Sequence, residues 1–404
     1  MKPTITLPPF PHAVEKWWWK ATKEKWPDWG EEKLLNSLRQ EIVAQSDRFN
    51  KDRSFEAGSY GSRDLSIFAY GNFYFSRTWM AMNYAVAETF ASCKWSAPRK
   101  GPIRILDLGS GTGSSGLATL HLLRYFGIKN PIELTAWDYS GKSLSFLKNL
   151  QRGCSELWPE TKVVTNRCDL RTFANFDQQQ KFDLILMGYS FNEIMQDQEI
   201  SDRDLWLCEC SQLLKRSGFL IITEPAEMKI CKNLQESASM LNKRYKSLHI
   251  HAPYLNGLHC PMAQKESKFF SHEVRRYRPV QIVEILNRPL RLEIREVKYG
   301  FTILSPILPD HQDSDFRTFR IISPIKKRKG TISFLGMGSD GQEYLYEFQR
   351  RDLLKEEMDD LLFLERGDIM RLEGGKIIEE NKRVRLNSSL ALKEVFVPRL
   401  GLSI

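Results

Sequence analysis

The sequence lacks the features of membrane proteins and of disulfide-rich proteins. It has no apolar run of about 18 residues, and its first residues form neither a signal-peptide core nor an acid-free, Arg- and Ser-rich transit helix. Its seven cysteines are scattered, odd in number and without any Cys-x-x-Cys pair. We therefore expect a cytoplasmic protein with no membrane contact, no disulfide framework and no metal site.

The chain also lacks a P-loop, although it has a glycine-rich turn. Residues 103–118 read IRILDLGSGTGSSGLA, a short apolar strand followed by glycines, and no Gly-Lys-Ser/Thr comes after them. Gly109, Gly111 and Gly113 let the backbone turn tightly and leave main chain bare for a ligand. Asp107 stands at the tip of the strand. This pattern predicts a nucleotide-binding α/β domain.

The turn has three interpretations, two of them with a nucleotide cofactor. Three of its glycines match the dinucleotide fingerprint, and Asp138 follows 22 residues after the last of them, Gly116, where an acid meets a ribose. However, Asp107 would face a doubly charged pyrophosphate, which is unfavourable. S-adenosylmethionine has no phosphate, and a carboxylate would attract its ammonium and sulfonium groups. We favour S-adenosylmethionine over a dinucleotide and over a turn without a ligand.

Apolar strands alternate with helical periodicity after the turn. The expected strands are residues 132–137, 163–167, 182–187 and 219–223. Such alternation implies right-handed crossovers and a parallel sheet, with its ligand cleft at the carboxyl ends of the strands. The expected fold class is therefore α/β.

Polar residues at the ends of these strands form the candidate site. Asp138 would accept hydrogen bonds from ribose hydroxyls, the alternative being the N-cap of the next helix. Asp169 would accept from the adenine amino group, or it is an ordinary loop acid. Tyr189, Asn192 and Glu193 would line the side where the acceptor enters, although the last two equally suit the start of a helix.

The composition changes along the 404 residues, which are too many for one ordinary core. We expect a helical extension over 1–95, a central domain over 96–325 with a basic insert at about 249–280, and a small β-rich domain over 326–404. Five tryptophans lie within residues 1–29. They are expected to pack against the rest of the chain or a partner, because so much exposed aromatic surface would be adhesive.

The net charge of +9 is concentrated in residues 263–330, which hold 15 Lys and Arg against 8 Asp and Glu. Two basic clusters, 275–278 and 326–329, have aromatic neighbours. These neighbours are Phe269, Phe270, Tyr277, Tyr299 and Phe319. The combination favours contact with RNA phosphates and bases, the alternative being a solvated basic face.

Several motifs together resemble those of one family. They are Tyr74-Phe-Ser-Arg77, Leu106-Asp-Leu-Gly-Ser-Gly-Thr-Gly113, Tyr189-Ser-Phe-Asn-Glu193, Glu224-Pro225, Ala252-Pro253 with Cys260-Pro261, and Lys326-Lys-Arg-Lys-Gly330. The chain resembles the Rsm22 family, methyltransferase-like proteins associated with the small subunit of mitochondrial and bacterial-type ribosomes. The resemblance implies a Rossmann-like class I methyltransferase domain, S-adenosylmethionine as cofactor, and the small ribosomal subunit or its rRNA as partner.

The resemblance breaks at one segment. In family members this segment looks like a site that binds an iron-sulfur cluster through four cysteines. Here the first position is Tyr254, the second is Cys260, the third is Ser271, and the strand at 331–336 has no cysteine. One thiolate cannot hold a cluster, so we expect none, with Tyr254 filling part of the space. The open alternative is a replacement metal site. Its candidate ligands are His249, His251, His259, Cys260 and His272.

The glycine turn and the resemblance predict an S-adenosylmethionine-dependent methyltransferase that acts on small-subunit rRNA. The Asn/Asp-Pro-Pro-Tyr/Phe turn of many amino-group methyltransferases is replaced by residues 189–193. In that place Glu193 would serve as a base and Tyr189 as a stacking platform for a flipped nucleobase. Two alternatives stay open: a catalytically silent assembly factor that keeps the donor pocket, and a small-molecule methyltransferase.

Overall fold

The structure is a computed structural model that places every candidate site residue. The described residues are 1–47, 61, 63–171, 180–196, 198–245, 248–255, 257, 259–263, 269–309, 315–374 and 377–401.

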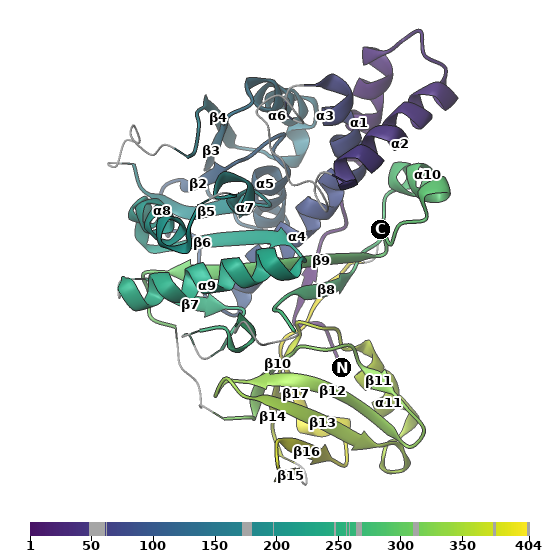
Figure 1. Cartoon of the computed structure of the whole chain (residues 1–404), viewed down its shortest axis with the longest axis vertical. Coiled ribbons are helices and arrows are strands. Elements are labelled where there is room, and N and C mark those ends of the chain that lie inside the picture. Colours follow the sequence, from purple (N-terminus) through teal and green to yellow (C-terminus); the bar gives the residue numbers. More distant parts are fainter. Residues whose placement is uncertain are drawn as a thin grey trace.

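A mixed sheet forms the centre of the molecule, with the order β4-β3-β2-β5-β6-β9-β7 and with β8 pairing β9 (Figure 1). Its strands are β2 (Ile103–Leu108), β3 (Ile132–Asp138), β4 (Thr161–Arg167), β5 (Phe182–Gly188), β6 (Leu214–Pro225), β7 (His249–Ala252), β8 (Glu273–Arg276) and β9 (Glu296–Ser305). The strands β4, β3, β2, β5 and β6 run parallel, whereas β9 is antiparallel to β6. The carboxyl ends of the parallel strands therefore share one edge.

Helices cover both faces of this sheet. They are α5 (Ser114–Tyr125), α6 (Gly141–Gly153), α7 (Phe191–Ile194), α8 (Ile200–Gln212) and α9 (Met228–Arg244), whereas α10 (Gln281–Leu290) packs against the N-terminal extension (Figure 1). Ile105 belongs to the core shared with α5, and the next residue, Leu106, belongs to the core shared with α8 and α9. Successive strand residues point to opposite faces, so strands covered on both faces are continuously apolar.

The N-terminal extension packs against one face of the sheet and is helical, as expected. It consists of β1 (Ile5–Leu7), α1 (His12–Lys25), α2 (Glu31–Asp47), α3 (Asp64–Ala69), a π-helical turn (Tyr70–Tyr74) and α4 (Phe75–Ala91). Trp18 is fully buried, Trp17, Trp19 and Trp26 pack against the same core, and Trp29 stacks on Trp26. The prediction that this segment packs against the chain is confirmed.

The C-terminal part is a second sheet, which lies below the first in Figure 1. Its order is β15-β16-β13-β12-β10-β14-β17, with β11 pairing β12. The elements are β10 (Thr318–Ile321), β11 (Lys326–Lys327), β12 (Thr331–Gly338), β13 (Glu343–Gln349), α11 (Lys355–Phe363), β14 (Ile369–Leu372), β15 (Ile377–Glu380), β16 (Arg383–Leu386), β17 (Leu392–Phe396) and β18 (Pro398–Leu400). Because β10 belongs to it, this sheet begins before residue 326.

Buried ion pairs and a strand pair join the two parts. Arg320 on β10 contacts Glu88 on α4 and Glu273 on β8, while Arg275 on β8 contacts Asp368 next to β14. All five side chains are almost fully buried. In addition, β1 pairs in parallel with β18, so the two ends of the chain lie side by side.

In the central sheet the antiparallel strand β9 lies between β6 and β7. This strand order is the arrangement of class I methyltransferases. The predicted fold class, a Rossmann-like α/β domain with a helical extension and a β-rich C-terminal part, is confirmed. None of the described helices has the length and apolar composition needed to span a bilayer.

Candidate functional site

The glycine turn lies between β2 and α5 and is shaped by packing as well as by dihedral angles. Gly109, Gly111 and Gly113 have φ values of 71°, 53° and 91°, a region that favours glycine. A Cβ on Gly109 would lie 2.4 Å from Cβ of Ser190, and the Ser190 hydroxyl donates to the carbonyl of Leu108 over 2.7 Å. The glycines therefore hold the turn directly against the end of β5.

Two carboxylates meet at this turn. Asp107 is fully buried, and its Oδ2 accepts from the amide of Gly116 over 2.9 Å, while its Oδ1 has no hydrogen-bond partner in the part of the chain that the structure describes. Asp138, at the end of β3, accepts from the amides of Gly111 and Ser140, each over 2.8 Å. The N-cap alternative for Asp138 is wrong, because Ser140 caps α6 by accepting from the amide of Ser143.

Two further carboxylates lie at the same edge of the sheet. Glu224, at the end of β6, is buried, and its Oε1 accepts from the amide of Asn192 over 2.8 Å. Glu193 is half-buried on α7, which also contains Asn192, so both residues belong to a helix. Tyr189 precedes α7. Asp138 and Glu224 both lie close enough to Glu193 to raise its pKa.

Burial raises the pKa of all four carboxyl groups. The pKa of Asp107 rises to about 7, that of Asp138 to about 6 and that of Glu224 to about 8. The pKa of Glu193 lies well above its usual value, through burial and then the neighbouring carboxylates. Among the described residues none of the four forms an ion pair. Arg203 on α8 is near enough to Glu224 to oppose part of this rise, whereas the glycine-turn side of the cleft edge stays acidic, which suits a cationic ligand.

Tyr189 adopts a strained backbone conformation at the end of β5. Its φ of 61° lies in the left-handed region, which is costly for an aromatic residue. Its hydroxyl donates to the carbonyl of Lys298 on β9, at 3.5 Å. Because β6 ends opposite Tyr299, this first part of β9 extends beyond β6 and forms a wall at the carboxyl edge.

Tyr70 is a site residue that the sequence pattern did not reveal. Its hydroxyl lies 3.1 Å from Oγ of Ser114, the first residue of α5, and 3.2 Å from Oγ1 of Thr78. Burial raises its pKa, and Glu193 and Asp107 are near enough to raise it further. The π-helical turn that presents it has no periodicity signal, and π-turns are frequent at functional sites.

Asp169 is the candidate that is exposed, and it follows Cys168, whose amide donates to the carbonyl of Asp138 over 3.0 Å. Its side chain is 45% exposed and pairs with Arg171 at 2.6 Å, and this pair lowers its pKa. Its adenine-binding role stays a prediction.

The family comparison agrees with this site. The model of the family described as mitochondrial small ribosomal subunit Rsm22 matches residues 67–343, well over half of the chain. The chain belongs to the Rsm22 family. The matched range contains the glycine turn, all four carboxylates and Tyr189. No curated protein matches the sequence.

Solved structures similar to this Rsm22 family member are methyltransferases. A putative class I S-adenosylmethionine-dependent methyltransferase from Listeria monocytogenes is 11% identical, with 74% of this chain and 90% of that chain covered and a TM-score of 0.39. Magnesium protoporphyrin IX methyltransferase from Synechocystis PCC 6803, with bound S-adenosylmethionine, is 12% identical, with 52% and 88% covered and a TM-score of 0.30. At such scores neither structure bears on activity, and the fold assignment depends on this chain's own strand order.

The segment where this chain departs from the Rsm22 pattern is packed without a metal-ligand set. The thiol of Cys260 donates to the hydroxyl of Tyr254 over 3.0 Å, and both pack with Met262 and with Met337 of β12. Tyr254 thus fills the first ligand position and Met337 comes from the strand expected to supply the fourth. These residues do not fit an iron-sulfur cluster, which needs several thiolates.

The structure does not bring together the histidines that were candidate ligands of a replacement metal site. Within the described ranges no group of three or more His, Cys, Asp or Glu side chains is placed to hold a metal. His272 stacks on Phe270 with ring centroids 4.3 Å apart, and burial lowers its pKa to about 4. The absence of a metal stays a prediction for elemental analysis.

The predicted basic face is only partly a surface, and residues 264–268 and 310–314 of it lie outside the described residues. Lys326 to Lys329 are exposed, whereas Arg275 is buried in its ion pair with Asp368. Three of the five neighbouring aromatics are buried, so their predicted stacking on bases is wrong. They are Tyr277, Tyr299 and Phe319. Strand alternation turns Tyr299 on β9 and Phe319 on β10 inward, where they bury more apolar area.

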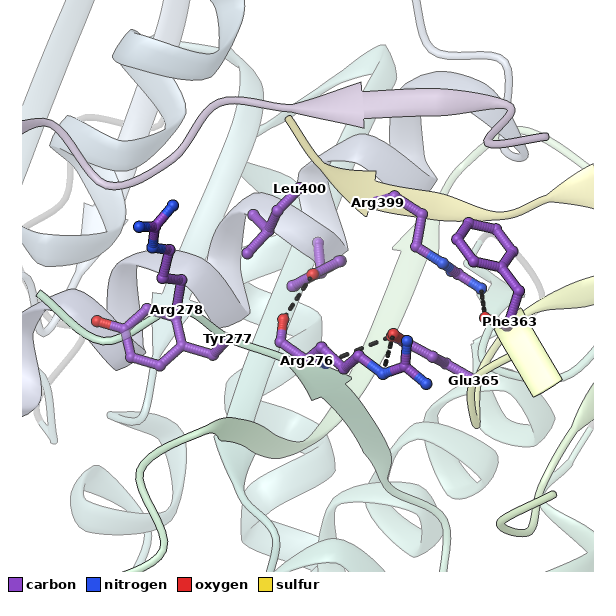
Figure 2. A pocket seen from close by; sticks show the side chains of 8 residues that line it. Arg276, Tyr277, Arg278, Phe363, Glu365, Arg399 and Leu400 are labelled. Atoms are coloured by element: carbon purple, nitrogen blue, oxygen red, sulfur yellow. Dashed lines mark hydrogen bonds and ion pairs between the residues drawn. The ribbon is translucent and has the colours of Figure 1, made fainter. Parts of the chain in front are cut away.

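A cavity of about 270 Å³ lies where the two sheets meet. Figure 2 shows Arg276 turned toward Glu365 and Arg399 beside Phe363, whereas Arg278 extends away from them. Arg276 pairs with Glu365 at 3.3 Å and Arg399 pairs with Asp368 at 2.6 Å. Two of the arginines that line this cavity, Arg276 and Arg399, are therefore neutralised by acids of the chain itself.

Proposed function

We propose that this Rsm22 family member binds S-adenosylmethionine at the glycine turn and methylates RNA of the small ribosomal subunit. The observation that carries the proposal is the pair of buried carboxylates at the glycine turn, Asp107 and Asp138, which form no ion pair among the described residues. A phosphate-bearing cofactor would be repelled there, whereas a cationic one would be attracted.

Unpartnered buried atoms on the turn support the fit of this cofactor. Besides Oδ1 of Asp107, the hydroxyls of Ser110 and Thr112 have no hydrogen-bond partner among the described residues. Buried polar groups normally have partners, so their absence points to a ligand. In the proposal Asp138 accepts from the ribose hydroxyls, and Asp169 accepts from the adenine amino group once Arg171 releases it.

The acceptor would enter beside Tyr189, Asn192 and Glu193. When bound, the donor supplies a methyl group on a sulfonium that a nucleophile displaces in line. Burial, and then the neighbouring carboxylates, raise the pKa of Glu193. A bound cationic donor would favour its ionised form, so Glu193 would accept the acceptor's proton more readily in the loaded protein. Tyr189 would provide the aromatic platform for a nucleobase.

Calorimetric titration with S-adenosylmethionine, its demethylated product and NAD tests the cofactor. The expected result is binding of the first two and none of NAD. Asp138→Asn should weaken donor binding by about tenfold, as loss of a charged hydrogen-bond acceptor. Glu133→Gln is the matched control, because Glu133 lies at the opposite end of the same strand β3 and pairs with Arg104. Tight NAD binding would overturn the proposal.

Methyl incorporation into small ribosomal subunits from a deletion strain tests the reaction. Wild-type protein should transfer label to the rRNA and Asp107→Asn should not. Donor binding without transfer to any RNA would instead identify an assembly factor. Absence of RNA binding would identify a small-molecule methyltransferase.

The compartment is also part of the proposal. The sequence predicts a cytoplasmic protein, whereas the description of the matching family names the mitochondrial small ribosomal subunit. Fractionation of source cells, with the protein followed on ribosomal gradients, distinguishes the two.

A further inference from the structure

Arg77 lies against the wall that the first part of β9 forms at the carboxyl edge of the sheet. The guanidinium of Arg77, on α4, donates to the carbonyl of Glu296 over 3.3 Å. The hydroxyl of Tyr189 contacts the carbonyl of Lys298, two residues further along β9. Arg77 is near enough to Tyr189 to influence the pKa of its phenol, which burial raises. Arg77 and Tyr189 therefore converge on the same short stretch of β9.

Among the described residues Arg77 forms no ion pair with a carboxylate. The side chain is half-buried, and its hydrogen bond to Glu296 goes to the neutral main-chain carbonyl. The carboxylate of Glu296 itself pairs with Lys298 over 3.1 Å. Glu224, which lies close to Tyr189, accepts from the amide of Asn192. A partly desolvated guanidinium without an anion is unfavourable, which points to an anionic ligand.

The surface beyond Arg77 continues with basic residues. On the paired strands β8 and β9, Arg276 lies opposite Glu296 and Val274 lies opposite Lys298. The side chains of Arg276 and Lys298 are 68% and 45% exposed. Each has an acidic neighbour, Glu365 and Glu296 respectively, so these two cations supply a weak field rather than a strong site.

We propose that Arg77 binds a backbone phosphate of the RNA acceptor, beside the nucleotide that Tyr189 receives. This inference rests on the proposed function and specifies how its acceptor is recognised. The cleft then separates charge: carboxylates face the cationic donor and Arg77 faces the anionic strand. A planar guanidinium with five donors suits a phosphodiester, and such contacts position a strand without reading its sequence.

Binding of in vitro transcribed small-subunit rRNA, measured over a series of salt concentrations, tests the role. Arg77→Gln should weaken binding about tenfold and reduce the slope of log K against log salt by roughly 0.7 to 0.9, as expected for one lost phosphate contact. Arg77→Lys should restore most of the slope, because the charge returns. Arg104→Gln is the matched control, since Arg104 is an arginine of β2 at the opposite edge of the sheet.

The outcomes separate this inference from the proposed function. Arg77→Gln should keep wild-type affinity for S-adenosylmethionine, and in transfer assays it should raise KM for rRNA with little change in kcat. An unchanged salt slope in a variant that still binds donor and rRNA would overturn the phosphate contact alone. Loss of donor binding in Arg77→Gln would show a structural role instead, and failure of the wild-type protein to bind the donor would overturn the proposed function itself.

Discussion

At the scale of single residues, the dominant feature is the group of carboxylic acids kept away from water at the carboxyl edge of the sheet. Asp107 at strand β2, Asp138 at β3 and Glu224 at β6 are each less than a tenth exposed. Their hydrogen bonds go to main-chain amides rather than to cations. Such an arrangement is costly for folding when the groups are ionised, and it prepares the site for positive charge.

The stability of the donor-free protein should therefore fall as pH rises from 5 to 8. The folded state holds protons on Asp107 and Asp138 up to pKa values of about 7 and about 6, while the unfolded state releases them near 4. The folded state thus binds more protons, and the free energy of unfolding decreases with pH. Urea unfolding at several pH values measures this.

The variant Asp107→Asn isolates the contribution of one group to that pH dependence. It should gain stability relative to wild type at pH 8 and little at pH 5, because its amide cannot ionise. S-adenosylmethionine should stabilise wild type more at pH 8 than at pH 5. A wild-type stability that rises over this range, with the same slope in the variant, would contradict the assigned pKa values.

A second residue-scale prediction compares two glycines with similar dihedral angles. Gly109 has φ 71° and a Cβ there would meet Ser190, whereas Gly127 has φ 76° and nothing within 4 Å of its Cβ position. Gly127→Ala should cost about 1 kcal/mol through backbone strain alone. Gly109→Ala should cost more than about 3 kcal/mol, because overpacking adds to strain. Equal losses in thermal unfolding would show that the turn is not packed against β5.

At the scale of elements, the parallel strands were predictable and the antiparallel ones were not recognised. The strand expected at 132–137 is β3, and the one expected at 182–187 is β5. They are covered on both faces and so read as continuous apolar runs. The strands β8 and β9 lie in a region interpreted from its charge as a surface. Strand pairing instead buried alternate residues such as Arg275 and Tyr299.

The segment between β7 and β8 supplies a prediction at this scale. Cys260→Ala and Tyr254→Phe should each lower the free energy of unfolding by about 1 to 3 kcal/mol, because each removes a partner of a buried hydrogen bond. Cys208→Ala, at a half-buried cysteine on α8, is the control and should change stability little. Elemental analysis of the purified wild-type protein should find less than stoichiometric iron and zinc. A full equivalent of either metal would contradict the packing interpretation.

At the scale of the whole molecule, buried charge holds the two sheets together. Arg320 spans from β10 to Glu88 on α4 and Glu273 on β8. The strand pair β1 and β18 adds a direct link between the ends of the chain. Because these contacts cross from one sheet to the other, the two parts should unfold together, and calorimetry should show one transition.

Removal of Arg320 tests this coupling. Arg320→Ala should destabilise the protein by about 3 to 5 kcal/mol, since it leaves Glu88 and Glu273 buried without their cation. Arg317→Ala is the control, because Arg317 is 61% exposed and lies 3.9 Å from Asp315. It should shift stability by no more than about 0.5 kcal/mol. A second calorimetric transition in Arg320→Ala would support coupling, whereas two transitions already in wild type would refute it.

The sequence by itself determined the fold class, the family and the place of the glycine turn, because apolar periodicity and glycine spacing are local properties of the chain. It also placed Asp107, Asp138 and Tyr189 at strand ends, where parallel topology brings them to one edge. Only the tertiary structure decided which charges face the cleft. Arg275 is neutralised in the core, whereas Arg77, beside Tyr189, forms no ion pair with any of the described carboxylates. Whether a charge is neutralised inside the protein or stays available to a ligand depends on which residues pack around it, and those residues come from distant parts of the chain.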